Sequence, residues 1–262
     1  MKVKHLVGAF LCVLGCYACS SPKTEVQSPD GHIKMTLTVD ENGKPFYNVS
    51  VDDSLLIENS AMGFTAANGI ILAEGFQVKN TTFSSEDETW TQPWGENKKN
   101  RNHYNEMAVS LTNEDQVQLT LRFRVFDDGI GFRYEYTVPT VDSLLITDEL
   151  TTFRFHRDGT SWSIPASAET YELLYQQQPI SEVETANTPF TFKTADGVYG
   201  SIHEAALYDF PEMTLKQIGH YTLKAELAPW PDGIKARKGN HFTTSWRTIQ
   251  IAPEAVGLIN SS

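Results

Sequence analysis

Apolar and polar residues alternate along two neighbouring stretches of this 262-residue chain. Every second residue from Val117 to Val125 is apolar, and the same spacing returns between Ile130 and Tyr136 after an Asp127-Asp128-Gly129 turn. A period of two places successive side chains on opposite faces of a β-strand. The pair therefore predicts an antiparallel hairpin in a sheet with one buried face and one wet face.

The same pattern recurs over most of the chain. Residues 32–39 and 46–51 alternate on either side of Asn42-Gly43, which is a hairpin signature. Further strand-like stretches are 151–156, 190–194, 198–203, 221–227 and 244–251. No stretch keeps helical spacing for more than two turns. Many short strands separated by turn residues predict an all-β fold, a large antiparallel β-sandwich, as one domain over residues 28–258.

The first 19 residues have the form of an export signal. A basic start precedes an apolar stretch, Leu6 to Gly15, that is too short for a permanent membrane span. Cys16 and Cys19 each follow small residues, as at a bacterial lipoprotein cleavage site, and either one is a candidate for acylation. We expect a periplasmic or outer-membrane-anchored lipoprotein in which residues 20–27 form a polar tether. An ordinary cleaved signal peptide is the alternative.

Cysteine content and charge exclude several classes of function. The third cysteine, Cys12, lies inside the apolar stretch, so the mature domain has no cysteine for disulfides or Cys-based metal sites. The 33 acidic and 21 basic residues give a net charge of −12. A chain this acidic repels a phosphate backbone, so we expect no nucleic-acid partner.

Residues 88–106 combine two tryptophans, a tyrosine, a histidine, carboxylates and four asparagines, without helical or strand periodicity. Aromatic rings cover the apolar face of a sugar, while amides and acids bind its hydroxyls. We interpret this segment as a long loop that binds an oligosaccharide. The candidate binding residues are Trp94, Glu96, Asn102, His103, Asn105 and Glu106. The alternative is that Trp90 and Trp94 cap the core and the polar residues are merely solvated.

Three other patterns of histidine and glutamate are candidates for a metal site or an acid–base pair. His203-Glu204 begins like a zinc-protease helix, but Leu stands at 207, where the second histidine belongs. A histidine with a carboxylate is the acid–base pair of a sugar mutarotase, and His103 with Glu106 is the less constrained candidate. His203 and Glu204 are neighbours on a strand, so they face opposite sides.

Five stretches resemble the N-terminal domain of glycoside hydrolase family 97, which comprises α-glucosidases and α-galactosidases. They are residues 28–31, 94–106, 122–135, 203–207 and 246–248. The resemblance implies a supersandwich similar to the galactose mutarotase fold, placed before a catalytic (β/α)₈ barrel. It also implies that Glu172 donates one ligand to a Ca²⁺ ion shared with that barrel. The resemblance places the catalytic carboxylates in the barrel, so no catalytic residue is predicted in this chain.

The sequence leaves three functional hypotheses. In the first, the chain is the non-catalytic sandwich of a family 97 α-glycosidase, as a truncated or split product that shapes the active-site cleft. In the second, it is a free-standing carbohydrate-binding lipoprotein. In the third, it is a mutarotase-like epimerase. Hydrolysis needs two carboxyl groups flanking the glycosidic bond, so we predict that the chain alone does not hydrolyse glycosides.

Overall fold

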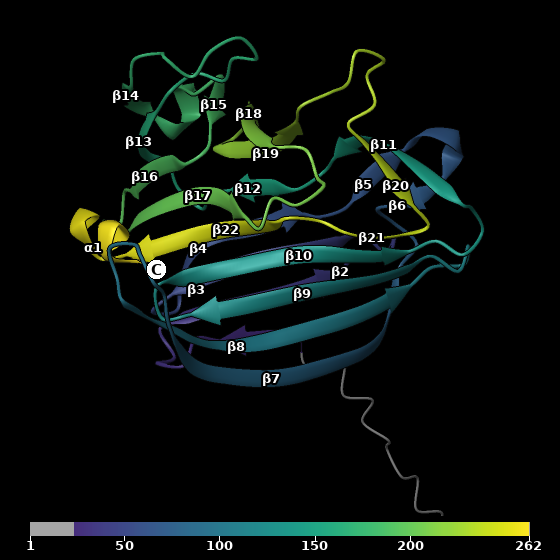
Figure 1. Cartoon of the computed structure of the whole chain (residues 1–262), viewed down its shortest axis with the longest axis horizontal. Helices are drawn as coiled ribbons and strands as arrows, with labels where there is room; N and C mark the ends of the chain where they lie inside the picture. The colour runs from purple at the N-terminus through teal and green to yellow at the C-terminus, as the bar shows by residue number, and fades with distance from the viewer. Residues whose placement is uncertain (1–23, 262) are drawn as a thin grey trace, which may run out of the picture.

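The computed structural model describes residues 24–261, and their regular structure is almost entirely antiparallel β-strand (Figure 1). The expected export signal and both candidate acylation sites, Cys16 and Cys19, lie outside the described residues. Among residues 24–261, no helix is both long enough and apolar enough to cross a bilayer.

The first four strands form one sheet in simple chain order. They are β1 (Glu25–Gln27), β2 (Ile33–Val39), β3 (Pro45–Val51) and β4 (Ser54–Ala61). The Asn42-Gly43 turn joins β2 to β3, which pair antiparallel, so the predicted hairpin is confirmed.

A second, larger sheet has ten strands in the order β14-β13-β16-β17-β22-β10-β9-β8-β7, with β21 paired to β10. Its strands are β7 (Gln77–Thr91), β8 (Lys99–Thr112), β9 (Gln118–Phe126), β10 (Gly129–Thr137), β13 (Gly159–Ser163), β14 (Gln176–Pro179), β16 (Phe190–Thr194), β17 (Tyr199–Ala205), β21 (His241–Thr243) and β22 (Trp246–Ala252).

Two smaller sheets of four strands each complete the fold. One contains β5 (Phe64–Ala66), β6 (Ile71–Leu72), β11 (Ser143–Glu149) and β20 (Ala236–Gly239). The other contains β12 (Thr152–Arg154), β15 (Thr185–Asn187), β18 (Met213–Gly219) and β19 (Thr222–Leu227). The helical segments are the 3₁₀ turns η1 (Ala67–Gly69) and η2 (Ile180–Glu182) and the short helix α1 (Ala255–Asn260).

A single buried apolar core joins these sheets. The β1–β4 sheet lies behind β8–β10 in Figure 1, and the rings of Tyr47 and Phe132 meet there with centroids 4.9 Å apart. On β5, Phe64 packs edge-on against Tyr134 of β10 at 5.0 Å. These aromatic contacts between layers confirm the predicted all-β sandwich and keep the large sheet rigid.

The predicted β9–β10 hairpin is also confirmed. Phe123 pairs with Phe132 and Leu121 with Tyr134, and all four side chains are buried. Their neighbours in sequence, such as Arg122 and Arg133, point to the opposite face of the sheet, which is only partly buried. The alternation of apolar and polar residues in β9 and β10 therefore results from burial of only one face of this sheet.

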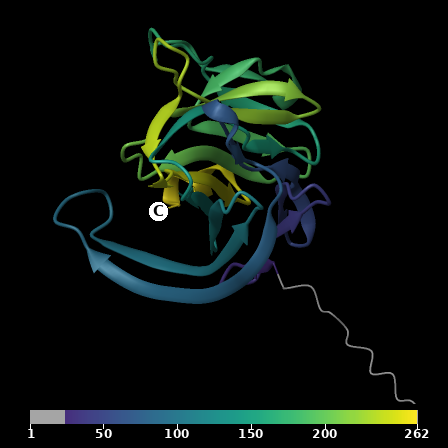
Figure 2. The ribbon, with the colours of Figure 1, turned by 90° about the vertical axis from the view of Figure 1, so that its right-hand side faces the viewer.

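The prediction that residues 88–106 form a long loop is wrong. The segment belongs to a hairpin in which β7 pairs with β8 from Gln77↔Thr112 to Thr91↔Lys99, and only residues 92–98 connect the two strands. The tip of this hairpin stands apart from the other strands (Figure 2). Because most of β7 is exposed on both faces, no buried face imposes an alternating pattern on its sequence.

Regular structure also extends into the segments next to the expected domain. Strand β1 lies within residues 20–27, which the sequence suggested as a tether, and pairs with β2. At the other end, α1 crosses the expected domain boundary at residue 258.

Candidate functional site

The face of the large sheet that points away from the core carries a continuous set of charged and aromatic side chains. We call it the outer face. The register of β8, β9, β10, β22 and β17 places its residues side by side. They are Tyr104, Glu106, Arg122, Arg124, Arg133, Glu135, Trp246, Thr248, Gln250 and His203.

Ion pairs cross the strands of the outer face. Arg122 contacts Glu106 at 2.5 Å and Glu135 at 2.8 Å. Glu106 also accepts from Arg124, and Glu135 from Arg133, each at 2.8 Å. Burial alone would raise the pKa of Glu135, but hydrogen bonds from Arg122 and Arg133 outweigh it and hold this pKa below its ordinary value. The network therefore keeps Glu135 ionised.

Glu135 should contribute stability that acid removes. A carboxyl whose pKa is lowered by folding stabilises the fold above its unfolded pKa, near the ordinary 4.5, and loses this contribution as the pH falls through the folded pKa. Glu135→Gln should lower the free energy of unfolding by about 1–3 kcal/mol at neutral pH. The difference from wild type should shrink towards about pH 3. Urea unfolding at a series of pH values measures this difference in stability, and Glu41→Gln, at an exposed position, is the control. A difference that does not change with pH would contradict the stabilising role of the Glu135 carboxylate.

Trp246 lies at the centre of the outer face. A Cβ atom on Gly131 of β10 would come within 3.4 Å of its Cε3 atom, so the missing side chain lets the indole approach the strand. Arg124 and Arg133 lie 4.8 and 4.7 Å from the ring centroid, and Arg124 also lies 4.4 Å from the ring of Tyr104. These cation–π contacts tie the arginines to the aromatic rings.

A cavity of about 360 Å³ opens beside Trp246. Strands β9, β10, β17 and β22 contribute most of its wall, including Arg124, Phe126, His203 and Gln250. This volume is in the range of small-molecule sites, roughly 300–1,000 Å³. Local sequence patterns do not reveal this cavity, because its walls come from strands spread over residues 118–252.

Two buried carboxylates converge beneath this face. Glu149 accepts two hydrogen bonds from Arg247, at 2.9 and 2.6 Å, and Glu204 accepts one at 2.7 Å. The side chains of Arg247 and Glu149 are fully buried, and that of Glu204 is nearly so. Burial opposes the charge of Arg247, but the two glutamates outweigh it and raise its pKa. The carboxylates of both glutamates are thus engaged in neutralising the guanidinium of Arg247, although Glu204 also borders the cavity beside Trp246.

The structure distributes the six candidate sugar-binding residues over three places. Trp94 and Glu96 are exposed in the connection at the tip of the hairpin. Asn102 lies on the outer face of β8, where it donates to Glu88 at 3.0 Å. His103 and Asn105 lie on the other face, and Asn105 donates to the carbonyl of Gln27 in β1. The sixth, Glu106, is held by the two arginines.

His103 and Glu106 do not form an acid–base pair. They stand three residues apart on β8 and therefore point to opposite faces. The charged group nearest to His103 is Asp127, whose carboxylate lies 3.8 Å from Nδ1, beyond hydrogen-bonding distance. Likewise, His203 and Glu204 face opposite sides of β17, as the sequence predicts.

Glu172, the expected calcium ligand, is exposed in the irregular segment between β13 and β14. Within residues 24–261, no group of three or more His, Cys, Asp or Glu side chains is arranged to hold a metal ion. Ca²⁺ requires about six to eight oxygen ligands, so Glu172 alone does not make a calcium site.

Exposed apolar side chains lie close to Glu172 in the sequence, and another is exposed after β17. Leu174 is 88% and Tyr175 69% exposed in the same segment, and Tyr208 is 82% exposed in the loop after β17. Tyr171 ties the first segment to β18 by donating to Glu212 at 2.6 Å. Tyr171 and Leu207 line one pocket, so the two segments lie side by side there. Exposed apolar patches mark interaction surfaces.

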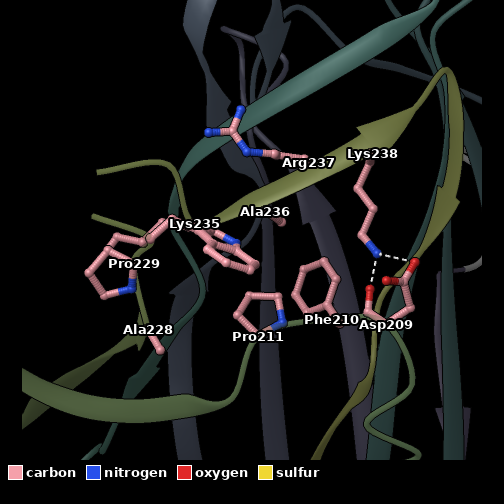
Figure 3. Close-up of a pocket in the computed structure, with 10 residues that line it drawn as sticks. Asp209, Phe210, Pro211, Ala228, Pro229, Lys235, Ala236, Arg237 and Lys238 are labelled. Atoms are coloured by element: carbon pink, nitrogen blue, oxygen red, sulfur yellow. Dashed lines mark hydrogen bonds and ion pairs between the residues drawn. The ribbon is translucent and has the colours of Figure 1, made fainter. Parts of the chain in front are cut away.

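A further cavity, of about 450 Å³, lies between β20 and the loops around Pro211 and Pro229 (Figure 3). Its cations already have acidic partners, and Figure 3 shows Lys238 bound to Asp209. Lys235 pairs with Glu226, and Arg237 pairs with Asp232. The cavity therefore presents little uncompensated charge to a ligand.

Comparison with known families identifies the chain. The family described as "Glycosyl-hydrolase 97 N-terminal" matches residues 26–262. The chain belongs to this family. The resemblance drawn from five short sequence stretches is thereby confirmed, and it extends over almost the whole described structure.

Relatives with known structure or activity contain this domain as a part. A glycoside hydrolase family 97 enzyme from Pseudoalteromonas sp. strain K8, solved with acarbose and as a variant with panose, is 39% identical. It superposes with a TM-score of 0.87 over 91% of this chain and 37% of its own. A retaining α-galactosidase from Bacteroides thetaiotaomicron is 25% identical over 87% of this chain and 36% of its own length. This chain thus spans little more than a third of the length of these relatives.

More distant structures share the fold alone. A β-arabinopyranosidase superposes with a TM-score of 0.79 at 21% identity. The galactosidase domain of an α-galactosidase-sucrose kinase superposes at 0.57 with 11% identity.

Proposed function

We propose that this chain is the non-catalytic N-terminal sandwich of an α-glycosidase, packed against a catalytic (β/α)₈ barrel and shaping one side of the active-site cleft. The observation that carries the proposal is the exposed apolar segment around Glu172, together with Leu207 and Tyr208. Apolar side chains exposed to water in this way are typical of a surface that a partner covers. In the relatives, the matched part is accompanied by a longer remainder of the enzyme.

Glu172 would contribute one carboxylate to a Ca²⁺ ion at this interface, and the barrel would supply the other oxygen ligands. Bound there, the ion would polarise or orient an oxygen of the sugar. The role of Glu172 itself is to place a negative charge at the edge of the sandwich. One relative is an α-galactosidase, and a family 97 enzyme was solved with panose, which favours an α-galactoside or α-glucoside as substrate of the complete enzyme.

A chimera tests the proposal. The matched part of the Pseudoalteromonas enzyme is replaced by this chain, and calcium affinity and α-glucoside hydrolysis are measured. Glu172→Gln should weaken calcium binding on the order of tenfold, with activity recovering at high calcium. Glu169→Gln, in the same exposed segment, is the matched control.

Two results would contradict the proposal. If a folded chimera cannot hydrolyse the substrate, this chain does not act as the sandwich of such an enzyme. If Glu172→Gln binds calcium as tightly as the Glu169 control, Glu172 is not a calcium ligand.

A further inference from the structure

The cavity beside Trp246 lies on the outer face, whereas the proposed calcium ligand belongs to the segment between β13 and β14. Binding in this cavity requires only residues of this chain, and neither the proposed barrel nor the calcium ion takes part in it. Small residues create the space in this cavity. Gly129 and Gly131 leave the first three residues of β10 without side chains on the outer face, and Ala205 stands opposite Trp246 in the β17–β22 register.

Polar groups that line the cavity are not satisfied by the protein. Three of these groups are His203 on β17 and Thr248 and Gln250 on the adjacent strand β22. Their side chains make no hydrogen bond to any other described residue. Arg124 uses only Nε, in its bond to Glu106, and its two Nη groups make no further hydrogen bond within residues 24–261. Hydrogen-bonding groups on three strands are therefore available to a ligand.

The charges around the cavity favour a neutral ligand. Glu106 compensates Arg124, and Asp128 also contributes to the wall. Trp246 and Phe126 supply apolar surface beside the polar groups. A compact ligand with many hydroxyls and apolar C–H faces matches this combination, whereas a multiply charged anion does not.

We infer that this cavity is a binding site for one or two units of a neutral oligosaccharide. His203, Gln250 and Arg124 bind the hydroxyls, and Trp246 contacts a C–H face. All residues of this site belong to the sandwich itself.

Isothermal titration of the purified chain with panose tests the inference. We expect saturable binding at millimolar panose. The double variant His203→Ala/Gln250→Ala should weaken it about 10- to 30-fold, since two hydrogen bonds are lost. Ala205→Trp, which fills the cavity from an exposed position, should abolish it. Circular dichroism confirms that each variant is folded.

Two exposed tryptophans serve as controls. Trp230→Ala alters the cavity of Figure 3, and Trp94→Ala alters the tip of the hairpin. Neither should change the affinity for panose. The inference is overturned if the wild-type chain does not bind panose, if the cavity variants bind as well as wild type, or if either tryptophan control loses binding instead.

Discussion

Replacing Arg247 with methionine should lower the free energy of unfolding by about 3–5 kcal/mol. Arg247 and Glu149 have no exposed side-chain surface, and Arg247 is the cation that both Glu149 and Glu204 contact. Without the guanidinium, two carboxylates remain buried with no counter-charge. They must then take up protons or admit water, and either response destabilises the packed state.

Urea unfolding followed by tryptophan fluorescence measures this effect. Arg237→Met is the matched control, because Arg237 forms an exposed ion pair with Asp232 and should change stability by only about 0–1 kcal/mol. Replacing Arg247 by Met together with Glu149→Gln and Glu204→Gln should restore part of the loss. Equal effects of Arg247→Met and Arg237→Met would contradict the view that the buried charges hold these strands together.

Gly43→Ala should destabilise the fold by about 2–4 kcal/mol. Gly43 has a positive φ of 73° in the β2–β3 turn, and its added Cβ would lie 2.3 Å from the backbone nitrogen of Phe76. The turn docks there through two backbone hydrogen bonds, from Gly75 to Asn42 and from Phe76 to Gly43. Since the obstacle is backbone, it cannot rotate away.

Gly31→Ala separates the two causes of this loss. Gly31 has a similar φ of 83° but nothing within 4 Å of the added Cβ, so its substitution should cost only about 1 kcal/mol, for the left-handed backbone. Thermal unfolding of both variants measures the difference. Similar losses at Gly31 and Gly43 would mean that the contact with Phe76 does not matter.

Sequence predicted the fold best where burial is one-sided. The β9–β10 hairpin was read correctly because every second side chain from Leu119 to Val125 enters the core. The β7–β8 hairpin was missed because residues such as Glu86 and Trp90 are in water while their backbone is fully paired. Backbone pairing leaves no periodic signature in the sequence when neither face is buried.

The candidate site was less accessible to sequence reasoning. Glu106 was proposed to bind sugar, yet it is shared by two arginines that stand two residues apart on β9. The cavity beside Trp246 depends on β22 pairing with both β10 and β17, and these pairings join residues far apart in the chain. In the sequence, the Trp246–Thr248 stretch stands out only through the family resemblance, because local pattern does not encode which distant strands pair.

The central claim is that this sandwich supports glycoside hydrolysis without performing it. Turnover of nitrophenyl α-glucoside and nitrophenyl α-galactoside by purified residues 20–262, with calcium present, tests it most directly. We predict no release of nitrophenol above the uncatalysed rate, because the buried acids Glu106, Glu149 and Glu204 are all paired with arginines. Sustained turnover that disappears on substitution of one of these glutamates would contradict the account.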